Sequence, residues 1–232
     1  MQFKDSAFKK AVTFSYDDGV TQDIRLIELL NKYHLKCTFN LNSEKLGQNR
    51  ILMCKGQRVS HYKVHPADVR EIYEGHEIAV HTLTHPRLTE LEEAEIIRQV
   101  EQDRLNLSEL AGYEVIGMAY PCGGVNNDDR VAEIIGRRTP VRYARTITST
   151  FNFEPQENLL RFNPSVHTMQ PELFDLAEKF IALQPETPQL FYIWGHSYEF
   201  DIPGGWERME KLCEMLAGRG DIAYLTNREA LL

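Results

Sequence analysis

The 232-residue chain carries 26 lysine and arginine residues against 34 aspartate and glutamate residues, so its formal net charge at pH 7 is −8. This acidic balance argues against binding to nucleic acid or to an anionic membrane surface through the overall field of the protein. The length fits one large domain, residues 1–232, and a hydrophobic content of 42% is enough for a core. No apolar run approaches the roughly 18 residues that a membrane-spanning helix needs.

The N-terminus and the cysteines indicate the compartment. Residues 1–5, Met-Gln-Phe-Lys-Asp, lack the apolar stretch of a signal peptide. None of the cysteines pairs with another at metal-ligand spacing; they are Cys37, Cys54, Cys122 and Cys213. We therefore expect a cytoplasmic protein whose thiols are free.

Strands and helices are predicted to alternate along the first half of the chain. Val12, Phe14 and Tyr16 fall on one face of an alternating run, which predicts a strand over residues 11–16. The other predicted strands of this half are 36–41, 57–64 and 77–80, with a hairpin near Gly56, and the predicted helices are 21–33, 66–75 and 89–110.

The same alternation continues to the C-terminus. The predicted strands are 116–120, 141–147, 159–162, 190–194 and 222–225, and the predicted helices are 128–137, 171–183 and 206–217. Alternating strands and helices are typical of a parallel sheet or barrel wrapped by helices. With about seven or eight strand candidates, the chain is close to a (β/α) barrel but short for one with eight complete repeats.

Polar residues follow four of the predicted strands. They are Asp17-Asp18, His81, Pro121-Cys122 and His196. The C-terminal ends of the strands in a parallel barrel converge on one face, and sites form there. We therefore expect these residues to share one site.

Aspartate and histidine in this pattern indicate a metal site. Asp17 and Asp18 are adjacent carboxylates at a strand end, and they repel each other unless a cation lies beside them. His81 and His85 lie four residues apart, and Pro86 favours a loop rather than a helix at His85. One aspartate and two histidines suit Zn²⁺ or a similar divalent metal, which leaves the second aspartate to act as a base on water. The residues predict a metal-dependent hydrolase.

Each motif also has a plainer interpretation. Asp-Asp-Gly is a common turn sequence, the histidine pair could lie on the surface, and His196 could belong to the core. Residues 121–124 form a turn by composition, in which Cys122 either directs its backbone N–H into the site or acts as a nucleophile, although no dedicated base accompanies it. We assign a structural or surface role to His34, His61, His65, His76 and His167.

Taken in order, these motifs resemble those of the polysaccharide deacetylases, the fourth carbohydrate esterase family. The first motif of that family, a strand ending in Asp-Asp-Gly, is matched by residues 13–19, and its His-Ser/Thr-x-x-His motif is matched by residues 81–85. The motif around Pro-x-Gly is matched at residues 121–123, and the apolar strand ending in histidine is matched at residues 190–196. Four motifs in the family's order make a specific signal.

The resemblance implies a fold and a set of roles. The fold would be of the α/β class, a distorted (β/α) barrel of about seven parallel strands surrounded by helices. Asp18, His81 and His85 would hold one divalent metal, with Zn²⁺ as the first candidate and Co²⁺ or another divalent ion as alternatives. Asp17 would be the general base and His196 the general acid.

Further residues are expected around the reacting group. The backbone N–H of Cys122 would stabilise the oxyanion together with the metal. Tyr120, Pro121 and Trp194 would contact the substrate.

The chain departs from the family pattern at two positions. The family usually carries an arginine two residues before the proline of its third motif, where it orients the base, and this chain has Ala119 there. The family's fourth motif usually offers an aspartate that positions the acid histidine, but no Asp-x-x-Asp occurs between Gly124 and Leu190. We expect Arg161 to replace the missing arginine near Asp17.

Three functions follow from these observations. The first is a metal-dependent deacetylase acting on an N- or O-acetylated sugar or on a small amide. The second is a hydrolase of a non-sugar C–N bond on a related barrel. The third is a catalytically inactive carbohydrate-binding or scaffold protein that kept the barrel. We expect no nucleic-acid or membrane partner, and the sequence predicts no oligomeric state.

Overall fold

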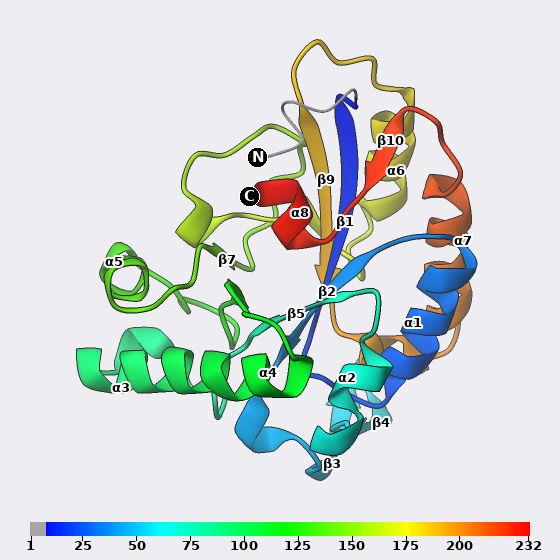
Figure 1. Ribbon diagram of the computed structural model, residues 1–232. Coiled ribbons are helices and arrows are strands. Elements are labelled where there is room, and N and C mark those ends of the chain that lie inside the picture. The colour runs from blue at the N-terminus through cyan, green and yellow to red at the C-terminus, as the bar shows by residue number, and fades with distance from the viewer. Residues whose placement is uncertain (1–7) are drawn as a thin grey trace.

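The computed structural model describes residues 8–232 as a curled parallel sheet surrounded by helices (Figure 1). The strands of this sheet are β1 (Lys10–Asp17), β2 (Cys37–Leu41), β5 (Glu77–Val80), β6 (Gly117–Ala119), β7 (Tyr143–Arg145), β8 (Val166–His167), β9 (Gln189–Gly195) and β10 (Ile222–Tyr224). Seven of them follow the order β7-β6-β5-β2-β1-β9-β8, and β10 pairs with β1. All of these pairs are parallel, as expected for the distorted (β/α) barrel.

Helices cover the outside of the sheet. The α-helices of the described residues are α1 (Gln22–Lys32), α2 (Val69–Ile72), α3 (Glu93–Ile97), α4 (Asp103–Ala111), α5 (Asp129–Arg138), α6 (Leu173–Ala182), α7 (Gly205–Leu216) and α8 (Asn227–Leu231). Helix α1 packs beside α7, and α3 packs beside α5 (Figure 1). The shorter helices are the 3₁₀ segments η2 (Ser43–Lys45), η3 (Pro66–Asp68), η4 (Leu88–Glu90), η6 (Leu159–Arg161) and η7 (Ser197–Asp201), and the π-helical η5 (Arg98–Gln102).

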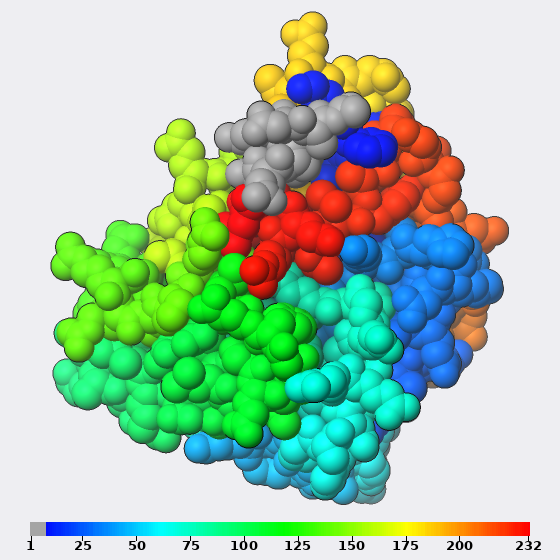
Figure 2. Space-filling view, viewed as in Figure 1, coloured from blue at the N-terminus to red at the C-terminus, as the bar shows by residue number. Residues whose placement is uncertain are grey.

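Strand β1 is the centre of the sheet. All eight of its residues are buried, because β2, β9 and β10 each pair with part of it. One hydrophobic cluster extends from Val12 in β1 to Ile222 in β10. The C-terminal helix α8 contacts β1, and the C-terminal residues, red in Figure 2, fill the surface between early and middle segments of the chain. The carboxyl end of β1 carries Asp17.

A hairpin outside the barrel extends beside the C-terminal ends of the strands. Strands β3 (Asn49–Cys54) and β4 (Gln57–Tyr62) pair with each other in antiparallel register. The sequence predicts this hairpin around Gly56, which adopts a φ of +80°. The hairpin is attached to the barrel at its base, where the Thr21 N–H donates to the Tyr62 carbonyl and the Val64 N–H donates to the Gly19 carbonyl.

The helix predicted over residues 89–110 is interrupted. It consists of α3, the π-helical turn η5 and α4 in succession. At this turn the carbonyl of Gln99 accepts the N–H of Leu83, and the Gln99 side chain bonds both the N–H and the hydroxyl of Thr84. The π turn therefore anchors the loop that carries His81 and His85, in keeping with the frequent location of such turns at functional sites.

The prediction of a strand over residues 159–162 is wrong. Residues 159–161 form the 3₁₀ turn η6, in which the Arg161 N–H bonds the Asn158 carbonyl. Only Phe162 forms a parallel bridge, to Arg145, and its N–H donates to the Ala144 carbonyl. The sequence analysis also missed β8 and α8, which are too short to show a repeating pattern of apolar residues. The N-terminal residues 1–5, on which the absence of a signal peptide was judged, lie outside the described residues.

Candidate active site

The polar residues after the strands converge on one cavity of about 240 Å³. Its lining is Asp17, Asp18, Arg50, Leu52, His81, His85, Tyr120, Cys122, Gly123, Ile147, Trp194, His196 and Tyr198. These residues come from the C-terminal ends of β1, β5, β6 and β9, from the hairpin and from the segment after β7. The residues expected to converge at the strand ends therefore line one cavity, except for Pro121.

Asp18, His81 and His85 form a group that could hold a divalent metal. One potential ligand atom from each lies within 4.8 Å of the others. The Nδ1–H of His81 donates to the Ala119 carbonyl at 2.9 Å, which leaves Nε2 unprotonated and facing the site. Burial lowers the pKa of both histidines, to about 3 for His85, so both imidazoles are neutral as metal ligands must be. Two imidazoles and a carboxylate fit zinc or a similar ion.

The backbone around this group adopts unusual angles. Asp18, Thr82, His85 and Cys122 have φ values of +86°, +67°, +63° and +69°, although none is glycine. Such conformations cost on the order of 1 kcal/mol or more each and cluster at sites where the structure over-determines them. Gly19 follows with a φ of +61°, and a Cβ there would lie 2.6 Å from Leu41 Cδ2. The Asp-Asp-Gly sequence is thus required by a tight turn as well as by its carboxylates.

Asp17 is held by an arginine from β7. Both carboxylate oxygens of Asp17 lie 2.5 Å from Nη2 of Arg145, and the Asn40 amide donates to Oδ1 at 2.8 Å. Arg145 is fully buried, and its guanidinium lies 4.4 Å from the centre of the Trp194 ring. Burial alone would raise the pKa of Asp17, but Arg145 and His81 lower it below its usual value. Asp17 is therefore ionised at neutral pH.

The expectation for Arg161 is wrong. Its guanidinium bonds Asp129 at 2.5 Å and Asn127 at 2.9 Å, on the outside of the barrel. The arginine beside Asp17 is Arg145, which pairs in register with Ala119 on the neighbouring strand β6. A charged residue inside the predicted strand 141–147 was the available signal.

His196 lies beside the carboxylate of Glu199, which also contacts a second histidine. Nδ1 of His196 lies 3.5 Å from Oε2 of Glu199, which also accepts the backbone N–H of His196 at 3.2 Å. Nε2 of His167, which was assigned a structural or surface role from the sequence, lies 3.3 Å from the same oxygen. Burial lowers the pKa of His196, but Glu199 outweighs burial and raises it to about 9. His196 is thus protonated at neutral pH and able to act as an acid.

The other predicted residues lie in or under the cavity wall. The Sγ atom of Cys122 lies 3.5 Å from the His85 carbonyl, and burial raises the pKa of its thiol, which argues against a nucleophile. Tyr120 and Trp194 line the cavity, although the Tyr120 hydroxyl donates to the Leu160 carbonyl at 2.8 Å. Pro121 is buried outside the lining, where its carbonyl accepts a bond from Asn126.

Two residues of the hairpin side contact Asp18. The ammonium of Lys63 donates to the backbone carbonyl of Asp18 and, at 3.2 Å, to its Oδ1. Nε2 of His61 lies 3.1 Å from Oδ2. Burial would raise the pKa of Asp18, but Lys63 and His61 hold it well below its usual value. His61 was assigned a structural or surface role from the sequence, because nothing local indicates where the hairpin docks.

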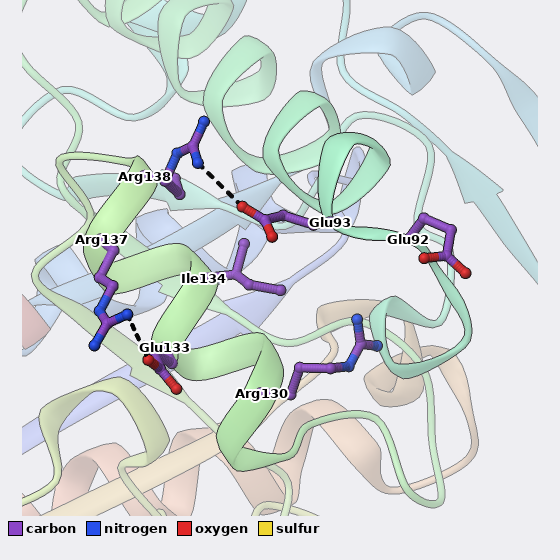
Figure 3. Close-up of a pocket in the computed structure, with 7 residues that line it drawn as sticks. All are labelled: Glu92, Glu93, Arg130, Glu133, Ile134, Arg137 and Arg138. Atoms are coloured by element: carbon purple, nitrogen blue, oxygen red, sulfur yellow. Dashed lines mark hydrogen bonds and ion pairs between the residues drawn. The ribbon is translucent and has the colours of Figure 1, made fainter.

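A larger hollow lies elsewhere on the surface. It has a volume of about 450 Å³ between α3 and α5 and is lined mostly by charged side chains that pair with one another (Figure 3). Arg138 bonds Glu93 at 3.1 Å and Arg137 bonds Glu133 at 2.8 Å. Because these charges are exposed and paired, the hollow offers no group activated for chemistry.

Comparison with known proteins identifies a matching family and related sequences. Residues 4–139, more than half of the chain, match the family model described as Polysaccharide deacetylase. The chain is similar to the peptidoglycan-N-acetylglucosamine deacetylase PgdA of Listeria monocytogenes, at 27% identity over 129 residues. This match covers 55% of the chain and 24% of PgdA, so it spans about a quarter of that relative's length.

Solved structures share the fold. The family 4 carbohydrate esterase from Streptomyces lividans, in complex with acetate, superposes with a TM-score of 0.57 at 14% identity and covers 94% of this chain and 92% of its own. The family 4 acetyl xylan esterase from Clostridium thermocellum, in complex with a cobalt ion, has a TM-score of 0.58 at 17% identity and covers 95% and 89%. Among residues 8–232 there is no helix both long and apolar enough to span a membrane.

Proposed function

Because the chain belongs to the polysaccharide deacetylase family, we propose that it is a metal-dependent deacetylase. Its substrate would be an N- or O-acetylated sugar or a small acetylated amide. The observation that carries the proposal is the common cavity of an Asp-His-His ligand group, an aspartate fixed by a buried arginine, and a protonated histidine. A divalent ion, with Zn²⁺ as first candidate and Co²⁺ as second, would be held by Asp18, His81 and His85.

The residues of the chain divide the proton transfers between them. A divalent ion in this position supplies Lewis-acid chemistry that lowers the pKa of water. Asp17 takes a proton from the water that attacks the acyl carbon, and Arg145 fixes the orientation of its carboxylate. His196 gives its proton to the nitrogen or oxygen of the leaving group as the acyl bond breaks. The products are acetate and the free amine or alcohol.

Two further groups would support the reacting carbonyl. The Cys122 residue adopts a φ of +69° at the cavity wall, and its backbone N–H is our candidate donor to the oxyanion. One such donor is typically worth about 3 kcal/mol in the transition state. Trp194 packs on Arg145 and lines the cavity, where it would contact the sugar ring.

The reading as an inactive scaffold loses its main support. It rested on the missing arginine and aspartate of the family pattern, but Arg145 contacts the base and Glu199 contacts the acid. We therefore prefer an enzyme. The cytoplasmic location stays a prediction.

A product assay tests the proposed function. The zinc-loaded protein would be incubated with acetylated chito-oligosaccharides, acetylated xylan and a small acetylated amide, and both acetate and ammonia would be measured. Acetate release supports the deacetylase. Ammonia without acetate from a panel of non-sugar amides would favour the related C–N hydrolase instead.

A further inference from the structure

The hairpin of β3 and β4 carries a fully buried histidine onto the proposed metal ligand Asp18. The His61 side chain is inaccessible to solvent, and its Nε2 lies 3.1 Å from Oδ2 of Asp18. The ring of Tyr198 meets the His61 ring edge-on, with 5.1 Å between the two centres. The imidazole is therefore held on one side by an aromatic ring and aimed at one carboxylate oxygen.

An arginine fixes which nitrogen of His61 carries the proton. Arg50 is the direct cross-strand partner of His61 in the hairpin, and its Nε–H donates to His61 Nδ1 at 3.2 Å. A nitrogen that accepts a hydrogen bond is unprotonated, so in the neutral ring the proton lies on Nε2. His61 thus donates to Asp18 through Nε2 and has no lone pair left there for a metal.

The two oxygens of Asp18 have different surroundings. Oδ2 is the acceptor for His61, whereas Oδ1 accepts from the Lys63 ammonium at 3.2 Å and lies 3.9 Å from Nε2 of His85. A carboxylate whose second oxygen is bonded in this way cannot rotate freely about its terminal bond. Partners of this kind set the orientation of metal ligands and their loss typically lowers metal affinity about 10- to 100-fold.

We propose that His61 is a positioning residue of the metal centre, which holds Oδ2 of Asp18 so that Oδ1 is presented to the ion. This inference rests on the metal site of the proposed function. It assigns the hairpin a role in metal affinity, with Arg50 as the residue that sets the tautomer of His61.

Zinc affinity of the metal-free protein tests this role without any assay of turnover. The protein is stripped with a chelator, checked by circular dichroism, and titrated with Zn²⁺ against a chromophoric competitor. We expect His61→Leu to weaken zinc binding about 10- to 100-fold, and His61→Gln, whose amide can donate near the position of Nε2, to recover part of the loss. Arg50→Met should produce a smaller loss of zinc affinity. This variant leaves His61 in place but no longer fixes which ring nitrogen carries the proton.

A matched control separates this role from general stability. His76 is also buried and also makes two hydrogen bonds, to the Cys37 N–H and to the Asn31 side chain, but away from the cavity. His76→Leu should lower the melting temperature and leave zinc affinity unchanged. The Co²⁺-loaded His61→Leu protein should in addition show shifted visible absorption bands, which the His76 variant does not.

The outcomes distinguish the two proposals. If wild-type protein binds zinc and the folded His61→Leu and His61→Gln proteins bind it equally well, the role of His61 is overturned and the metal site stands. If the wild-type protein binds neither Zn²⁺ nor Co²⁺, the metal site itself is overturned, and the role of His61 with it.

Discussion

Arg145 bonds both carboxylate oxygens of Asp17, although it lies on β7, one strand beyond the β6 position at which the family pattern has an arginine. Its Nη2 is 2.5 Å from each oxygen, and its partner in the strand register is Ala119, where the family usually has that arginine. Strand β7 follows β6 at the edge of the sheet, and the long side chain of Arg145 extends from there to Asp17. Asp17 thus has an arginine partner, but this arginine lies on β7 and not on β6.

Replacing this arginine should slow turnover without removing the metal. Arg145→Lys keeps the charge but loses the bonds of Nε to the Ser15 hydroxyl and of Nη1 to the Thr146 carbonyl, which fix the guanidinium beside Asp17. Misplacement of a catalytic group by about 1 Å can cost about 100-fold. We expect a drop in kcat of about that size with unchanged zinc content. Arg161→Gln is the control, because Arg161 pairs with an Asp129 that is 90% exposed, and its kcat should match wild type. An equal loss in both variants would contradict the assignment.

The acid histidine should define the alkaline limit of activity. The pKa of His196 is raised to about 9, so its protonated form is complete at neutral pH and is lost as the pH rises through about 9. The profile of kcat/KM should fall there. In Glu199→Gln the neutral amide no longer raises the pKa of His196, and burial lowers it. The alkaline fall in kcat/KM should therefore move to lower pH. A profile unmoved in Glu199→Gln, with Glu210→Gln as an exposed control, would show that Glu199 does not tune the acid.

Lys63 should stabilise the metal-free protein. Its ammonium is buried against Asp18, and removing one partner of a buried ion pair typically costs about 3–5 kcal/mol. Lys63→Met should lower the free energy of unfolding by about that amount in urea without metal, and saturating Zn²⁺ should restore more stability to it than to wild type. Lys32→Met, from an exposed pair with Glu210, should change little. Equal stabilities of Lys63→Met and wild type without metal would refute the pairing.

The π turn should matter for the histidine loop. Gln99 bonds the N–H of Thr84 at 3.1 Å and its hydroxyl at 2.9 Å, between the two proposed histidine ligands. Gln99→Leu keeps the volume and removes both bonds, so we expect weaker zinc binding, by about 10-fold, with retained helix content. Gln102→Leu, in the same turn but bonded to Asn106 on the surface, is the control. Unchanged zinc affinity in Gln99→Leu would mean that the loop is fixed by its backbone alone.

Some of the site follows from local sequence, because strands with buried residues deliver their next residues to one edge. For this reason Asp17, Asp18, His81 and His196 were expected to lie together, and they line one cavity. The signal for Glu199 was also local, since it lies three residues after His196 in one 3₁₀ turn. It was missed because the family pattern directs attention to a different segment.

Other parts of the site depend on three-dimensional register. The strand around residues 141–147 was predicted, but the contact of Arg145 with Asp17 requires the strand order and the pairing with Ala119, which no local pattern contains. His61 likewise lies on a predicted strand, but its contact with Asp18 depends on how the hairpin packs in three dimensions. The run at 159–162 is apolar enough for a strand, yet a turn closed by Asn158 leaves only Phe162 to pair.

The most direct test of the account is acetate release by zinc-loaded wild-type protein beside Asp17→Asn, with zinc content measured in the same samples. Asparagine is close in shape to aspartate but accepts no proton, so the variant should keep its metal through Asp18, His81 and His85 and release no acetate, while wild type does. If Asp17→Asn retains near-full turnover, Asp17 is not the base. If zinc-loaded wild type releases no acetate from any acetylated sugar or amide, the protein is not the deacetylase proposed.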